Sequence, residues 1–424
     1  MQKTTHNPVM AWAVTLTAAL FFLYEFIQLT MPNMINSELR QAFDLDAEQV
    51  GVLISMYFWA NMLCLFPAGN LLDRYSTKKL LIFAALLCTI GTFIFSTAQV
   101  YFCAALGRFI VGMGAAFCFL SCIRLASRWF PPTRMALVTG IVVTMAMIGG
   151  LVGQSPMLLL VKAVGWREAI FLDGILGIVV ILIVLWLVQD RPPNSQDSIE
   201  ADKHHLQSLG FFSGIKLVLT NPNNWLGGTY TTLLNLPVFL LGSSWGGVYL
   251  EQIHHLTRVQ SSYAADMLFV GVIFGSPAFG WFSDHIGRRC LPMMIGAVLS
   301  LIAMMVLMYA PDLSLTSLMF LFFLIGFVTS SQVLSYPAIA ELNPIALTGT
   351  ALSIASVLIM GSGVVALPLF GKLLELNWDH TKVGGAAIYS LHDFNTALWI
   401  IPIAFIIGLV ISFLIRETYC ESQV

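Results

Sequence analysis

The chain contains 424 residues, of which 58% are hydrophobic and only 10% are charged, and its formal net charge is −2 at pH 7. A soluble protein of this length carries far more surface charge, so the composition excludes a soluble globular protein. Outside the short polar loops no basic patch is interleaved with aromatic residues, so no nucleic-acid partner is expected.

Apolar stretches of about 20 residues recur along the whole chain, and each is long enough to cross about 30 Å of hydrocarbon as a helix. Because lipid offers the backbone no hydrogen bonds, each stretch is expected to be helical. The first is expected to remain as a span, because few polar residues precede it and no typical cleavage site follows it. The twelve predicted spans are 11–34, 48–71, 79–98, 101–127, 135–161, 168–188, 224–250, 260–282, 291–310, 314–336, 347–373 and 394–415.

Lysines and arginines are distributed unevenly between the predicted loops. Most of the 20 basic residues fall on the side that also holds both termini, and the positive-inside rule identifies that side as cytoplasmic. The sequence therefore predicts an integral multi-pass membrane protein with both termini in the cytoplasm. A bacterial cytoplasmic (inner) membrane is the expected location.

A glycine followed four residues later by an aspartate occurs twice, each time between two apolar runs. Gly69 and Asp73 form the first copy, and Gly280 and Asp284 form the second, 211 positions later. This spacing is half the length of the chain and indicates an internal duplication into two parallel halves.

The duplication divides the chain into two predicted bundles and a linker. The N-terminal six-helix bundle is expected over 1–189, the cytoplasmic linker over 190–223 and the C-terminal six-helix bundle over 224–424. Asp190-Arg191-Pro192-Pro193 is expected to end the sixth helix, because proline cannot continue it. A short amphipathic helix is expected at 211–219, at the cytoplasmic interface.

The two loops and three further motifs resemble the major facilitator superfamily. The further motifs are Arg108-Phe109-Ile110-Val111-Gly112-Met113-Gly114 in the fourth span, Trp129-Phe130-Pro131-Pro132 before the fifth and Gly165-Trp166-Arg167 before the sixth. The resemblance covers the whole chain. It implies an all-α membrane protein with twelve transmembrane helices in two parallel six-helix bundles, working as a secondary transporter by alternating access.

A narrower resemblance points to bacterial carriers related to the lysosomal dipeptide carriers. It rests on Gly153-Gln154-Ser155-Pro156 and on Ser331-Gln332-Val333-Leu334-Ser335-Tyr336-Pro337, which is followed by Glu341. It implies a small zwitterion or a peptide as the transported solute.

The repeated loops are expected to act as hinges between the halves. Gly69 and Gly280 carry no side chain and let a neighbouring helix approach closely. Asp73 is expected to face the positive N-terminal end of helix 11, which begins near Asn343-Pro344, and Asp284 to face the start of helix 5. Such contacts would hold the cytoplasmic side closed; an ordinary positively charged loop is the alternative. The basic residues assigned to the hinges are Arg74, Arg134 and Arg288.

A cytoplasmic gate is predicted where helices 4 and 10 end. Arg124 and Arg128 lie one turn apart near the inner end of helix 4, and Glu341 lies just past the inner end of helix 10. We expect an ion pair between these arginines and Glu341 in the outward-open state alone. Contact of both arginines with lipid headgroups is the alternative.

Glu25 and Arg108 are the clearest charged residues inside the predicted spans. A charge there costs about 2.5–3.5 kcal/mol on the insertion scale, so it usually faces a cavity or a partner. At about 1.5 Å per residue the two lie at similar depth on helices 1 and 4, which face the central cavity in the fold that the chain resembles. We expect them to pair in the empty site, so that a solute carboxylate competes for Arg108 and releases Glu25 to take a proton. A static ion pair that fixes packing is the alternative.

Further polar residues in the spans complete the predicted site. Asp266 in helix 8 is expected to bind a solute amine or Arg108, or instead to cap its helix or form an outer gate. Asp173 is assigned a structural role, because helix 6 is expected to be peripheral. The remaining candidates, each of them alternatively a packing residue, are Tyr24, Gln28, Tyr57, Asn61, Gln154, Asn235 and Tyr336.

A secondary transporter is the function that these features favour. No phosphate-binding Gly-Lys loop supports ATP-driven pumping, and no serine–histidine or metal-ligand constellation supports an enzyme, so no cofactor or metal is expected. The expected function is proton-coupled import of a small carboxylate, amino acid or peptide by a monomer in the bilayer. The alternatives are export or import of a carboxylate-rich siderophore or other metabolite, an uncoupled facilitator and a non-transporting membrane sensor.

Overall fold

The computed structural model describes residues 8–45, 47–193, 211–310, 313–376, 378–379, 382–383 and 386–423. Within this part of the chain, twelve helices are long and apolar enough to cross a membrane, which confirms the predicted fold class. A two-residue antiparallel hairpin, β1 (Lys382–Val383) with β2 (Ala386–Ala387), lies in the loop before the last span.

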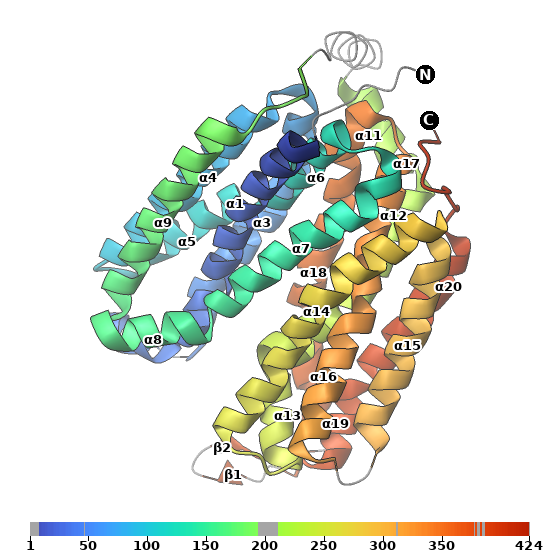
Figure 1. Ribbon diagram of the computed structural model, residues 1–424. Coiled ribbons are helices and arrows are strands. Elements are labelled where there is room, and N and C mark those ends of the chain that lie inside the picture. Colours follow the sequence, from blue (N-terminus) through green and yellow to red (C-terminus); the bar gives the residue numbers. More distant parts are fainter. Residues whose placement is uncertain are drawn as a thin grey trace.

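The first half of the chain forms the bundle drawn in blue to green in Figure 1. Its helices are α1 (Pro8–Met34), α2 (Asn36–Phe43), α3 (Ala47–Arg74), α4 (Thr77–Thr97), α5 (Tyr101–Ala115), α6 (Cys118–Trp129), η1 (Pro132–Arg134), α7 (Met135–Val152), α8 (Ser155–Val164) and α9 (Trp166–Leu187).

The second half forms the bundle drawn in yellow-green to red. Its helices are α11 (Phe211–Thr220), α12 (Pro222–Pro237), η2 (Val238–Trp245), α13 (Gly246–Ile253), α14 (Arg258–Ile286), α15 (Cys290–Tyr309), α16 (Leu315–Thr329), η3 (Ser330–Leu334), α17 (Ser335–Glu341), η4 (Ile345–Leu347), α18 (Thr348–Glu375), α19 (Leu391–Leu398) and α20 (Ile400–Leu414).

Helix 5 breaks at Gly153-Gln154 and helix 12 at Trp399, and three further spans are interrupted part-way in ways that an apolar run does not reveal. Helix 4 is divided into α5 and α6 at Ala116-Phe117, helix 7 becomes a π-helix in η2, and helix 10 passes through the 3₁₀ stretch η3. Irregular backbone within a membrane is tolerated where it is buried in protein or lines a cavity, and π-segments are frequent at functional sites. All three interruptions contribute residues to the central cavity described below.

The two bundles lie side by side and touch through two matched helix pairs, α3 with α18 and α7 with α14. They converge on the side where both termini lie and spread apart toward the opposite side (Figure 1). This structure is therefore closed on the side that holds both termini, which the distribution of lysine and arginine predicts to be cytoplasmic.

The structure describes only part of the predicted linker, because 194–210 lie outside the described residues. The short helix expected at 211–219 is α11. Its Val218 is buried, and the side-chain amide of Asn224 donates a 2.9 Å hydrogen bond to the Val218 carbonyl oxygen. This contact fastens the end of the linker to the start of α12.

Candidate transport site and gates

A cavity of about 170 Å³ lies between the two halves, enclosed by helices of both. Most of its wall is apolar, and seven aromatic rings face it: Phe22, Phe26, Phe58, Phe119, Phe239, Phe269 and Tyr336. The rings of Phe119 and Tyr336 meet across the boundary between the halves, with their centroids 4.5 Å apart. Among the described residues that line the cavity, Glu25 is the only charged one.

Five polar side chains in the cavity wall keep hydrogen-bonding capacity for a solute. The hydroxyl protons of Thr30, Ser243 and Ser356 are already engaged, because each hydroxyl donates to a backbone carbonyl. The Oδ1 atom of Asn61 is buried and has no hydrogen-bond partner among the described residues. The other side chains free of a partner in the same part of the chain are Glu25, Asn235, Gln332 and Tyr336.

Arg108 lies behind Glu25 and does not line the cavity. Its side chain is fully buried, its Nη1 donates a 2.9 Å hydrogen bond to the carbonyl oxygen of Gln28, and its guanidinium lies 5.1 Å from the ring centre of Tyr57. Among the residues described, no ion pair within 4.0 Å joins Arg108 to Glu25, although the two charges act on each other. The predicted direct pair is therefore not formed in this conformation.

Asp173 belongs to the same buried group, which the sequence did not indicate. The side-chain amide of Gln28 donates to Asp173 Oδ2, so Gln28 connects α1 to both Arg108 and Asp173. Asp173 is 4% exposed, and its Oδ1 has no hydrogen-bond partner among the described residues. The sixth span, α9, is thus not merely peripheral at the depth of Asp173 in the bundle.

The structure separates the predicted site residues into two groups. Glu25, Asn61, Asn235 and Tyr336 line the cavity. Tyr24 hydrogen-bonds Thr92 on α4 at 3.3 Å, away from the cavity. The predicted residues that do not line it are Tyr24, Gln28, Tyr57, Arg108, Gln154 and Asp266.

Asp73 ties the first half to the start of α18. Its carboxylate accepts hydrogen bonds from Gly349 N at 2.8 Å and from both the backbone nitrogen and the hydroxyl of Thr350 at 2.7 Å. Arg124 Nε lies 3.4 Å from Asp73 Oδ1, and the Arg124 guanidinium also donates to the carbonyl oxygen of Ile345. An acid at a helix N-terminus is stabilised by the helix dipole, so the geometry locks α3 onto α18.

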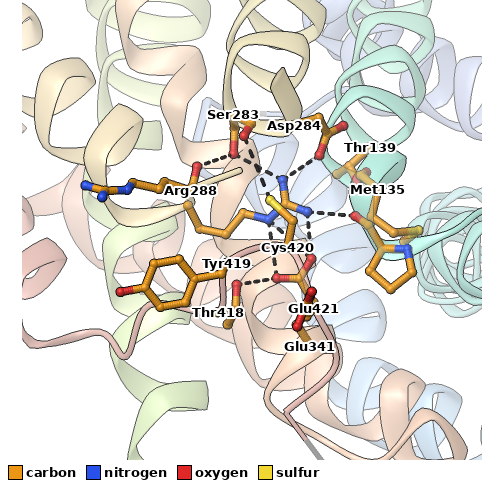
Figure 2. A network of polar contacts seen from close by, with 12 residues as sticks. Met135, Thr139, Ser283, Asp284, Arg288, Glu341, Thr418, Tyr419, Cys420 and Glu421 are labelled. Carbon is orange, nitrogen blue, oxygen red and sulfur yellow. Dashed lines mark hydrogen bonds and ion pairs between the residues drawn. The ribbon is translucent and has the colours of Figure 1, made fainter. Parts of the chain in front are cut away.

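Asp284 makes the matching contact from the second half (Figure 2). Its Oδ2 accepts a 2.9 Å hydrogen bond from Leu137 N at the start of α7. Arg289 lies 2.6 Å from both Asp284 and Glu341, and it donates a 2.8 Å hydrogen bond to the carbonyl oxygen of Pro132 across the boundary. Burial alone would lower the pKa of Arg289, but the Glu341 and Asp284 carboxylates raise it above its ordinary value, so Arg289 is a fixed cation.

Two features of the predicted gate need correction. Glu341 pairs with Arg289, and Arg124 pairs with Asp73, so the expected pair between helices 4 and 10 is replaced by two separate pairs. Arg128 Nη1 instead donates to the hydroxyl of Thr77 at 2.9 Å.

The inward-facing basic residue after the second loop is Arg289, and not Arg288 as predicted. Arg288 and Arg134 are exposed, and Arg74 Nε contacts Asn70 on its own helix at 3.3 Å. Figure 2 shows Arg288 directed away from the Asp284–Glu341 network.

In each half, an acidic residue that follows the last membrane span caps the third span of the same half, which is α4 in the first half and α15 in the second. Asp190 accepts from Lys78 N at 2.7 Å at the start of α4. Glu417 accepts from Arg289 N at 2.7 Å and from Cys290 N at 3.0 Å at the start of α15. In the second half the chain continues, and the Thr418 hydroxyl donates to Glu341 itself. The C-terminal tail therefore contacts the gate directly.

The fold and the repeated loops define a membrane carrier of two six-helix bundles. The chain belongs to the Major Facilitator Superfamily, whose family model matches residues 14–368 and 249–420. This is a family of transporters and not of enzymes. The chain is an integral multi-pass membrane protein with bacterial relatives.

Sequence comparison finds distant bacterial relatives. The "Uncharacterized transporter YybO" of Bacillus subtilis is 22% identical over 269 residues, so the match spans only 60% of each chain. The "Probable galactarate/D-glucarate transporter GarP" of Escherichia coli K12 is 23% identical over 397 residues, which cover 86% of this chain and 85% of the relative. Among solved structures, the proton:xylose symporter XylE superposes with a TM-score of 0.73 at 13% identity over 98% of both chains, which shows a shared fold.

Proposed function

We propose that this protein imports a small organic anion, such as a carboxylate, amino acid or peptide, together with protons across the bacterial inner membrane. The observation that carries the proposal is the position of Glu25, which is the charged residue of the cavity wall and is backed by the buried cation Arg108. The protein is proposed to work as a monomer.

Coupling follows from the charges around the cavity. Within the low-dielectric centre of the protein, an ionised Glu25 repels an anion strongly. A proton on Glu25 removes this repulsion and leaves the positive charge of Arg108 available to the solute. The proton and the anion therefore favour each other's binding, which is the requirement for symport.

Alternating access is supported by two contacts on the cytoplasmic side, which we call the first lock (Asp73 with α18) and the second lock (Asp284 with α7). Asp73 holds α18 and Asp284 holds α7 in the closed arrangement, and both contacts cross the boundary between the halves. Release of the solute into the cytoplasm requires both to break. The cavity residues Phe119 and Tyr336 lie on the same two inner half-helices that carry Arg124 and Glu341, so a solute between the rings can bias the gate.

The solute class is supported by a relative whose name gives galactarate and D-glucarate, which are organic anions. The five free polar groups of the cavity suit a solute that carries several hydrogen-bonding groups. The apolar, aromatic wall favours a solute with some carbon framework over an inorganic anion.

Reconstituted uptake tests the proposal. Proteoliposomes holding the full chain are given an inward proton gradient and a panel of radiolabelled carboxylates, amino acids and peptides. We expect one class to accumulate against its gradient, and the accumulation to collapse when a protonophore is added. Transport without accumulation would show an uncoupled facilitator, and binding without any flux would show a sensor; either result overturns the proposal.

The matched substitutions are Glu25→Gln and Glu168→Gln. Glu168 is an exposed acid on α9, outside the cavity, and its replacement is expected to leave uptake unchanged. Glu25→Gln is expected to abolish accumulation while solute exchange continues. Accumulation at the wild-type level in Glu25→Gln would remove Glu25 from the mechanism.

A further inference from the structure

We propose that Glu25 and Asp173 share a single proton around Arg108 in the empty protein, so that Asp173 is a second protonation site. The inference rests on the proposed function in one respect, namely that Glu25 is the acid that exchanges protons with the cavity. The inference assigns a role to Asp173 of α9, the sixth span, which does not line the cavity.

Helix α1 brings both carboxylates into the group around the Arg108 guanidinium, whose charge acts on each of them. Gln28 on α1 accepts a hydrogen bond from Arg108 through its carbonyl oxygen and donates one to Asp173 through its side-chain amide. Glu25 precedes Gln28 by three residues, which places both on the same face of α1. The exposed fractions are 3% for Glu25, 1% for Gln28, 0% for Arg108 and 4% for Asp173, so no member of the group is open to bulk water.

The hydrogen bonding of this group is incomplete in a specific way. Arg108 Nε and Nη2 have no hydrogen-bond partner among the described residues, and neither does Asp173 Oδ1. A buried polar atom without a partner is costly, so such a group tends toward arrangements that complete its bonds. Arg108 therefore has two donor nitrogens without a hydrogen-bond partner, and Gln28 bonds to both Arg108 and Asp173.

The charge count decides the protonation state. The other titratable groups facing the cluster are Tyr24 on α1, Cys88 on α4 and Cys118 on α6. All three are neutral at physiological pH, because the ordinary pKa values of these side chains are about 8.5–10. Two carboxylates and one guanidinium then leave a net charge of −1 in the hydrocarbon, and a net buried charge is strongly unfavourable. One proton makes the cluster neutral.

The shared proton can occupy either carboxyl group. When it is on Asp173, the ionised Glu25 faces Arg108; when it is on Glu25, the ionised Asp173 faces Arg108. A solute carboxylate beside Glu25 adds a second negative charge to be balanced near Arg108, so a second proton must enter through Glu25. Neutrality is kept throughout, because one proton enters with each negative charge of the solute.

Infrared spectroscopy of the purified full-length chain tests this without any solute. A protonated carboxyl has a C=O stretching band that ionised carboxylates lack. We expect the wild-type protein to show one such band at neutral pH from this cluster. The same band should be absent from Asp173→Asn and from Glu25→Gln, because each variant keeps one acid, which balances Arg108 in its ionised form. Arg108→Gln should instead gain one protonated carboxyl, and Asp173→Glu should restore the band.

The control is Glu168→Gln, which removes an exposed acid from the same helix as Asp173 and should leave the band unchanged. If Asp173→Asn keeps a band that Glu25→Gln loses, Glu25 holds the proton alone and the inference is wrong. A band lost in Asp173→Asn and kept in Glu25→Gln would show a permanently protonated Asp173, which also overturns it. Either result leaves the proton-coupled uptake test of Glu25 intact, so the two proposals fail separately.

Discussion

Gly69 of α3 and Gly349 of α18 pack backbone against backbone at the boundary between the two halves. A Cβ atom on Gly69 would lie 2.4 Å from the carbonyl oxygen of Gly349, closer than atoms can approach without a shift of the helices. Gly280 has the same relationship to Ala136 on the other side, also at 2.4 Å. The glycine of each repeated loop therefore allows the contact that its aspartate then locks.

Gly69→Ala is expected to open the cytoplasmic side. Overpacking of this kind costs about 1–3 kcal/mol, which favours the open arrangement roughly tenfold. Spin labels at the exposed positions Tyr75 and Ile345 report the distance between the halves. Gly51→Ala is the control, because Gly51 lies on the same helix with nothing within 4 Å of its Cβ position. Unchanged distances in Gly69→Ala would show that the close contact does not limit opening.

Asp73→Asn is expected to open the same side more than Asp284→Asn does. Asp73 accepts three hydrogen bonds from α18, and hydrogen bonds to charged groups contribute about 1.5–3 kcal/mol each. In Asp284→Asn, Arg289 keeps its contact with Glu341. The same label pair measures both variants, and an equal or reversed order would contradict the account of the locks.

Removal of 417–424 is expected to loosen the second lock. The truncation deletes the Glu417 carboxylate that caps α15 and the Thr418 hydroxyl that donates to Glu341. Loss of a helix cap costs about 1 kcal/mol. Hydrogen exchange at the backbone nitrogen of Cys290 should accelerate several-fold, and Glu417→Gln should reproduce part of the effect. Glu421→Gln, at an exposed position of the same tail, should change nothing.

Acidification is expected to destabilise the end of α13 through His254. Burial, followed by the nearby His255, lowers the pKa of His254 in the folded protein, where its ring lies 3.3 Å from the Tyr249 hydroxyl. Above the ordinary value of about 6.5 the ring is neutral in both states and has no effect. Below it the unfolded state binds the proton more readily, so stability falls as pH drops. His254→Gln should show a smaller loss of melting temperature between pH 7.5 and pH 5, and an identical loss would refute this.

The helices are predictable from the sequence because lipid requires helical spans, and the duplication is predictable because the loop motif repeats. A span must be helical and apolar over a fixed length, so twelve runs and a repeat of 211 residues are sufficient to predict the architecture. The interruptions in helices 4, 7 and 10 are not predictable in this way. They depend on packing around a cavity that exists only once the two halves have met.

For the site, the sequence predicts the depth of each residue in the membrane but not the direction in which its side chain points. Counting residues places Glu25 and Arg108 at one level, yet it does not fix how far each side chain is turned around its helix. Arg108 therefore contacts Gln28, and Asp173 joins the group, although neither contact is visible in the sequence. The same limit applies to the gate, because Arg288 and Arg289 lie in the short loop between α14 and α15, and the sequence does not show that Arg289 is the one that points inward.

Proton movement driven by the solute tests the central claim most directly. Proteoliposomes without any imposed gradient carry an external pH indicator, and a transported anion is added outside. We predict that the external pH rises as solute enters in the wild-type protein and in Glu168→Gln, and that it stays constant in Glu25→Gln while solute still exchanges. Solute entry without a pH change in the wild-type protein, or an undiminished pH change in Glu25→Gln, would contradict proton coupling through Glu25.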